Sequence, residues 1–114
     1  MKKIEALVRN SKIHSVKDAL QNAGINGMTI YEVKGLGTQK GQTTGGGRPG
    51  TTTGAALNPK TKIEIVCNDG EVRKIMSAIA SSARTGSPGD GKIFVYTIED
   101  SMRIRTGEIG SNAV

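Results

Sequence analysis

A glycine-rich segment followed by one lysine carries the residue types in this chain that are best suited to chemistry. Residues 85–91 read TGSPGDG, and Lys92 follows them at the start of an apolar run, IFVYTI. Glycines allow a close approach to a ligand and let a loop turn backbone N–H groups toward an anion, and a lysine adds a point charge suited to phosphate. The segment predicts a phosphate-binding loop, although Gly, Pro and Asp gathered before a strand also form ordinary turns.

A second pair of cations, Arg103 and Arg105, stands near the C-terminus with one residue between them. If this segment is extended, both guanidinium groups point to the same side, because side chains alternate along a strand. Two fork-shaped cations could then bind two phosphate groups. The alternative for any lone Arg-x-Arg pair is a solvated tail. The glycine-rich loop in the same chain favours phosphate binding.

These segments and the rest of the chain resemble the PII signal-transduction proteins. The resemblance covers nearly the whole sequence and rests on MKKIEALV, DALQNAGINGMTIYEVKGLGTQKG, PKTKIEIV, ARTGSPGDGKIFV and RIRTGE. The residue order of the last two segments is particular to that family. The resemblance implies a homotrimer with clefts between neighbouring subunits, where ATP or ADP binds as an effector, and a regulatory protein that is not an enzyme.

The resemblance also implies which residues line the nucleotide cleft. One subunit would hold the phosphates with Gly89, Asp90, Gly91 and Lys92, and the next subunit would contribute Arg103 and Arg105. Three further residues match positions around the adenine and ribose: Thr29, Glu64 and Val66. Positions beside the phosphates are matched by Gly37, Thr38 and Gln39.

In the family, a site for 2-oxoglutarate lies beside the γ-phosphate and is usually completed by Mg²⁺. Gln39 matches the metal-contacting glutamine, Lys60 matches the lysine that pairs with the distal carboxylate, and backbone amides from Gly37 to Gly41 would complete the site. We expect Mg²⁺ only together with ATP and no metal site formed by the protein alone.

This chain departs from the family at Thr38, where relatives have an arginine that reaches the γ-phosphate. Charge-assisted hydrogen bonds are stronger than neutral ones. The substitution therefore predicts weaker discrimination of ATP from ADP and a weak or absent response to 2-oxoglutarate.

The region 37–59 loses hydrophobic periodicity and is rich in Gly and Thr. A loop of about 22 residues is far longer than usual, and its composition predicts a mobile segment. The matching T-loop of the family usually carries a modified tyrosine or serine; no tyrosine is present here, which excludes uridylylation at the usual place. Arg48 is the only charged residue in 43–58. It is either a tip that inserts into a partner's acidic or carbonyl-lined opening, or part of an unselective flexible loop.

Length and composition narrow the class of protein. The 114 residues favour one domain, 1–114, with a formal net charge of +6. One Phe, two Tyr and no Trp leave little for bases to stack on, which argues against nucleic-acid binding. Cys67 is the only cysteine, and no apolar run approaches the roughly 20 residues of a membrane span. We therefore expect a cytoplasmic protein that does not insert into the membrane.

Hydrophobic periodicity predicts the elements that position these residues. Alternating apolar side chains indicate strands at 2–9, 27–37, 60–67 and 92–98, and helical stripes follow the first and third strands. Ser11 can cap the first helix, Gly24 can end it, and a capping-box-like pair starts the second, Asn68 and Glu71. The order favours an α+β fold, a ferredoxin-like βαββαβ sandwich with a C-terminal tail at 99–114.

The favoured interpretation is a regulator that senses cellular energy state through ATP or ADP and acts on a partner through its long loop. The altered loop favours a membrane transporter of a nitrogenous solute, such as an ABC transporter for amino acids or polyamines. The alternative is a standard nitrogen regulator that responds to ATP plus 2-oxoglutarate and controls an ammonium channel or a metabolic enzyme. A small phosphatase lacks an evident general base, and an RNA-binding module lacks its aromatic strand motif.

Overall fold

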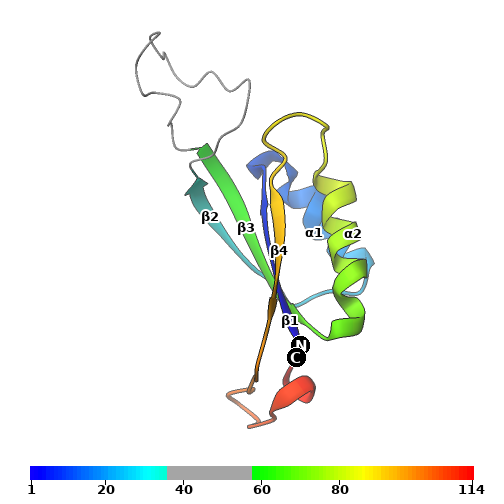
Figure 1. Cartoon of the computed structure of the whole chain (residues 1–114), viewed down its shortest axis with the longest axis vertical. Coiled ribbons are helices and arrows are strands. Elements are labelled where there is room, and N and C mark those ends of the chain that lie inside the picture. The colour runs from blue at the N-terminus through cyan, green and yellow to red at the C-terminus, as the bar shows by residue number, and fades with distance from the viewer. Residues whose placement is uncertain (36–57) are drawn as a thin grey trace.

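The computed structural model describes residues 1–35 and 58–114, and 36–57 lie outside the described part. Four strands and two helices follow one another in the order β1 (Lys2–Val8), α1 (Ile13–Asn22), β2 (Thr29–Gly35), β3 (Asn58–Cys67), α2 (Val72–Ala83) and β4 (Lys92–Thr97). Both helices lie on the same side of the sheet (Figure 1). This arrangement confirms the predicted βαββαβ order and the α+β class.

The four strands form one sheet in the order β2-β3-β1-β4, and every neighbouring pair is antiparallel. β1 and β2 therefore run parallel to each other with β3 between them, which is the split βαβ arrangement of a ferredoxin-like fold. In the register of β1 and β4, Leu7 pairs with Lys92 and Lys2 pairs with Thr97. The end of β1 consequently lies beside the start of β4, where the glycine-rich loop arrives.

The core lies between the sheet and the helices. Alternate residues of β1 and β3 face it, and the two helices cover it with their predicted stripes. The buried apolar side chains include Ile4, Ala6, Val8, Ile63, Ile65, Val16, Leu20, Ile75 and Ile79. Each fully buried aliphatic side chain of this size contributes about 1.5–3 kcal/mol relative to an exposed one. The alternation that predicted the strands is thus also what fixes the face on which the helices pack.

Neither of the predicted N-terminal helix caps is present. A short 3-10 turn precedes each helix, at 10–12 and 69–71, and no side chain caps the first turn of either helix. The carboxylate of Asp69 instead accepts a hydrogen bond of 2.9 Å from the N-terminal ammonium group of Met1. The predictions for Ser11, Asn68 and Glu71 were therefore wrong. Gly24, with φ of 84°, ends α1 as predicted.

The predicted bounds of the strands also change. β1 and β4 each end one residue earlier than predicted, at Val8 and Thr97. β2 is shorter than 27–37, and β3 begins at Asn58 rather than Lys60. Pro59 is tolerated in β3 because pairing with β1 stops at Thr61, so that only β2 lies beside the proline. The end of the predicted loop 37–59 is therefore strand, and the rest of that loop lies outside the described residues.

The C-terminal tail is folded rather than extended. Met102 and Ile109 form an isolated antiparallel bridge, and the backbone N–H of Arg103 donates to the carbonyl of Glu108 at 2.8 Å. The chain reverses between them, with φ of 74° at Gly107. The extended conformation that would align the guanidinium groups of Arg103 and Arg105 is therefore not adopted, because Arg105 lies in the turn.

Candidate functional site

The glycine-rich loop connects α2 to β4 and lies against the end of β1. Gly89 and Gly91 have φ of 106° and 103°, values that residues with a Cβ rarely adopt. A Cβ at position 91 would overlap the carbonyl oxygen of Leu7, and one at position 89 would lie 2.9 Å from the guanidinium of Arg9. Both glycines are therefore required by backbone conformation and by close packing.

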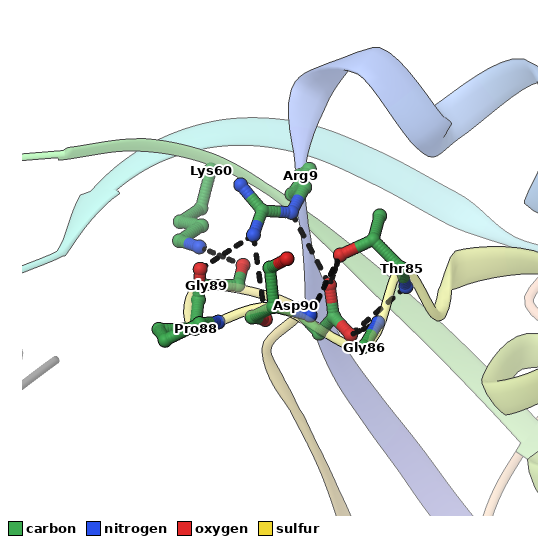
Figure 2. A network of polar contacts seen from close by, with 8 residues as sticks. Arg9, Lys60, Thr85, Gly86, Pro88, Gly89 and Asp90 are labelled. Carbon is green, nitrogen blue, oxygen red and sulfur yellow. Dashed lines mark hydrogen bonds and ion pairs between the residues drawn. The ribbon is translucent and has the colours of Figure 1, made fainter. Parts of the chain in front are cut away.

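The carboxylate of Asp90 points back into its own loop (Figure 2). Its Oδ2 accepts hydrogen bonds of 2.9 Å from the backbone N–H groups of Thr85 and Gly86, and its Oδ1 accepts one of 2.5 Å from the Thr85 hydroxyl. These bonds, led by the one from the Thr85 hydroxyl, hold the pKa of Asp90 far below its ordinary value. The Asp90 carboxylate thus organises the loop. An anion could bind to Asp90 only at the backbone N–H of this residue.

Two cationic side chains, one just after β1 and one on β3, bind backbone carbonyl groups of the loop (Figure 2). Arg9, which follows β1, donates from Nε to Asp90 at 3.3 Å and from Nη2 to the carbonyl of Pro88 at 2.5 Å. Lys60, on β3, donates from Nζ to the carbonyl of Gly89 at 2.5 Å. Burial and the nearby Arg9 lower the pKa of Lys60. Lys60, which was predicted to bind an effector carboxylate, therefore contacts the glycine-rich loop.

The remaining predicted residues of the described chain lie away from this loop. Thr29 pairs with Glu64 across β2 and β3, and the side chains of Glu64 and Val66 lie on the face of the sheet opposite the helices. Glu64 accepts a hydrogen bond from the Tyr31 hydroxyl, which lowers its pKa, and its carboxylate lies 3.7 Å from the Lys3 ammonium. Gly37, Thr38, Gln39, Gly41 and Arg48 lie outside the described residues.

The two predicted groups of phosphate-binding cations are at opposite ends of β4. Lys92 begins the strand beside the loop, whereas Arg103 and Arg105 follow its other end, in the tail (Figure 1). At about 3.4 Å per residue, the two ends of the strand are separated by roughly 17 Å. This distance is beyond the reach of an arginine side chain. One chain therefore brings together the loop, Arg9 and Lys60, but not the two arginines.

The face of the sheet that the helices leave bare combines aromatic side chains with an ordered set of charges. Tyr31, Phe94 and Tyr96 are 36%, 44% and 44% exposed. Charges of opposite sign alternate between them, with Nζ of Lys3 3.9 Å from Glu5 and Nζ of Lys62 3.8 Å from the same carboxylate. Exposed aromatic side chains of this kind are enriched in protein–protein contacts, whereas charges are depleted from the centre of such contacts.

A cavity of about 270 Å³ lies beside the loop, between the C-terminal end of α2 and the start of β4. Its apolar wall is formed by Val8, Ile79 and Ile93, and Arg84 lies at its edge. The volume is slightly below the roughly 300–1,000 Å³ of small-molecule pockets. Val8 and Ile93 belong to the core-facing side of the sheet, so the cavity does not by itself join the loop to the face that carries Glu64 and Val66.

Two classes of feature are absent from the part of the chain that the structure describes. Within 1–35 and 58–114, no three His, Cys, Asp or Glu side chains gather where they could bind a metal ion. Among the same residues, neither helix has the length and apolarity needed to cross a membrane.

Comparison with known proteins shows the family of this chain. The family model described as nitrogen regulatory protein P-II matches residues 1–108. This chain belongs to the P-II family. Over the full length of both chains, it is 47% identical to the nitrogen regulatory protein P-II of Rhodospirillum rubrum and 49% identical to that of Mesorhizobium japonicum. The resemblance seen in the sequence is thereby confirmed.

A solved structure of the family has the same fold. The crystal structure of Arabidopsis thaliana PII bound to citrate superposes with a TM-score of 0.80 and is 37% identical in sequence. The match covers 99% of this chain and 91% of the plant chain. The P-II family is one of regulatory proteins, and the ferredoxin-like fold is confirmed by this neighbour.

Sequence reasoning missed two side chains that hold the glycine-rich loop together, those of Arg9 and Thr85. Arg9 is 81 positions from Asp90, so no local motif joins them. The pairing of β1 with β4 was the available indication, since it places the residue after β1 next to the loop before β4. Thr85 was included in the loop, but its capping of Asp90 depends on the conformation of the turn.

We predict that Gly91→Ala destabilises the protein by at least about 2 kcal/mol, because the added Cβ combines a left-handed φ with overlap against Leu7. Urea unfolding measures the change. Gly70→Ala is the matched control, since a Cβ there meets no atom within 4 Å. Equal stability of the two variants would contradict the tight contact between the loop and β1.

We predict that Asp90→Asn lowers the free energy of unfolding at neutral pH and that the difference from wild type shrinks in acid. The pKa of Asp90 is lowered in the folded state, so its stabilisation is complete above the ordinary carboxyl pKa of about 3.9 and is lost as pH falls below it. Denaturation at pH 7 and pH 3 tests this. Asp18→Asn, on the exposed side of α1, is the control. A difference for Asp90→Asn that is unchanged at pH 3 would contradict the low pKa.

Proposed function

We propose that this protein is an energy-sensing regulator that binds ATP or ADP in clefts between neighbouring copies of its own chain. The separation of the phosphate loop from Arg103 and Arg105 carries the proposal, because the arginines can complete the loop's site only from another copy. Membership of the P-II family supports the same reading. The chain would work as a homotrimer, with three equivalent clefts.

The bare face of the sheet supports assembly. Its tyrosines and Phe94 are exposed in a single chain, and burial of such side chains is a main source of stability in obligate oligomers. The tail adds Ile104, which is 99% exposed between the two arginines. A neighbouring copy that covers Ile104 would also fix the direction of both guanidinium groups.

The chemistry of the cleft suits a polyphosphate bound to adenosine. Lys92, Arg103 and Arg105 supply cations, and the loop supplies backbone N–H groups. Thr29, Glu64 and Val66 would surround the adenine and ribose, and Gly37, Thr38 and Gln39 would lie beside the phosphates. Mg²⁺ would enter with ATP.

The proposed protein is not an enzyme, and its carboxylates support this view. A general base must be free to accept a proton. Asp90 already accepts three hydrogen bonds from Thr85 and Gly86 and contacts Arg9, whereas Glu64 accepts one from Tyr31. Nucleotide occupancy would instead change how the long loop, with Arg48 near its middle, contacts a partner.

The proposed partner is a membrane transporter of a nitrogenous solute, reached from the cytoplasm. The net charge of +6 favours an acidic surface on that partner. An ammonium channel or an enzyme of nitrogen metabolism is the alternative, and the relatives that are named nitrogen regulatory proteins support a role in nitrogen control.

We predict that replacing Arg103 and Arg105 together with methionine weakens ATP and ADP binding by at least about a hundredfold, since two charge-assisted contacts are lost. Isothermal titration measures affinity, and light scattering measures the mass of the assembly. Arg73→Met, on the exposed side of α2, controls for the loss of positive charge. Unchanged affinity in the double variant, or a monomeric wild type, would contradict the proposal.

A mixing experiment tests whether the site is shared between copies. The Lys92→Met variant and the double arginine variant, each defective alone, are unfolded together and refolded as a mixture. Each mixed trimer then contains one cleft with an intact loop and an intact tail, so about a quarter of the clefts should recover binding in an equal mixture. Absence of recovery would place the whole site within one chain.

We predict that 2-oxoglutarate with Mg²⁺ raises the affinity for ATP by less than about twofold, in keeping with the loss of the arginine at position 38. Lys60 would also have to leave the Gly89 carbonyl before it could pair with a carboxylate. Titration of ATP with and without 2-oxoglutarate measures the effect. A large rise would favour the standard nitrogen regulator, and citrate, which the plant relative binds, is a useful second effector to titrate.

A further inference from the structure

We propose that Arg9 is a positioning residue for the nucleotide phosphates, which holds residues 87–90 so that the backbone N–H groups of Gly89 and Asp90 are turned toward the ligand. The inference rests on the proposed nucleotide site and adds to it a residue that acts from behind the loop. Arg9 would not touch the nucleotide itself.

Arg9 forms hydrogen bonds with the loop at three residues between positions 87 and 90. Its Nη2 donates to the carbonyl of Pro88 at 2.5 Å and reaches that of Ser87 at 3.5 Å, while its Nε donates to the Asp90 carboxylate at 3.3 Å. The guanidinium also packs directly under Gly89, where no Cβ intervenes. One planar side chain therefore fixes carbonyls and a carboxylate on the same side of the loop (Figure 2).

The carbonyl contacts of Arg9 and Lys60 also determine where the next N–H groups point. In a planar trans peptide, the C=O of one residue and the N–H of the next point in opposite directions. Because Arg9 binds the carbonyl of Pro88, the N–H of Gly89 points away from Arg9. Lys60 binds the carbonyl of Gly89, so the N–H of Asp90 points away from Lys60 in the same manner.

The preceding residues of the loop, 85–88, have no N–H group left for the ligand. Those of Thr85 and Gly86 donate to the Asp90 carboxylate, and that of Ser87 donates to the Thr85 hydroxyl at 3.1 Å. Proline at position 88 has no N–H to offer. The N–H groups of Gly89 and Asp90 are therefore the ones that Arg9 and Lys60 turn outward, in the part of the loop assigned to the phosphates.

The alternative to positioning is that Arg9 attracts phosphate by its charge alone. Substitution of Arg9 by lysine distinguishes the two roles. Arg9→Lys keeps the charge but cannot reproduce a planar fork that contacts Pro88 and Asp90 together. Positioning predicts that this variant binds poorly. Attraction by charge predicts that it binds like wild type.

The test measures ADP affinity of full-length wild type, Arg9→Met and Arg9→Lys, with Arg73→Met as the matched charge control. We expect both Arg9 variants to bind at least about tenfold more weakly and the control to stay within about twofold of wild type. Circular dichroism and the mass of the assembly establish that each variant is folded. If Arg9→Met fails to fold, Arg9→Lys still decides between positioning and charge.

A second measurement needs no ligand. Hydrogen exchange of the Thr85 and Gly86 amides, followed by NMR, should accelerate in both Arg9 variants, because Asp90 loses the group that holds it against them. Unchanged exchange, wild-type affinity in Arg9→Met, or wild-type affinity in Arg9→Lys would each overturn the inference. If wild type binds no adenine nucleotide while exchange accelerates, the proposed function fails and the holding of the loop by Arg9 is supported.

Discussion

The pairing of β1 with β4 is the constraint on which the rest of the site depends. It sets Leu7 opposite Lys92, and this register leaves no room for a side chain at Gly91. The same register places Arg9, the first residue beyond β1, behind the loop that leads into β4. A slip of one residue would exchange the faces of β4 and move the loop away from the cation that holds it.

The charged groups behind the loop lie close together. Burial, and the nearby guanidinium of Arg9, lower the pKa of Lys60. The ionised carboxylate of Asp90 and the carbonyls of Pro88 and Gly89 offset the repulsion between the two cations. Because all three side chains are partly buried and contact the same short stretch of backbone, they are best understood as one unit.

The sequence predicts the elements well because their signal is repetitive. The alternation of Ile63, Ile65 and Cys67 or the helical stripe through Ile75 and Ile79 reports burial at every step, and burial is what forms the core. Features that depend on a single turn are less predictable. The tail around Arg105 folds back through one left-handed glycine, and α2 begins with a 3-10 turn in place of a capping box. Arg9 was missed because its partners are remote in sequence.

The proposed division of the site between the two ends of β4 has a consequence for regulation. A ligand that needs both the loop of one chain and the tail of another binds only the assembled form, and such a ligand stabilises that assembly by mass action. Nucleotide binding and subunit contact are then linked in free energy, and each must strengthen the other by the same amount. A loop that is ordered in advance by Arg9 and Lys60 reduces the conformational entropy lost on binding. In the proposed regulator, the energy of the phosphate contacts would then remain available to change the contact with a partner.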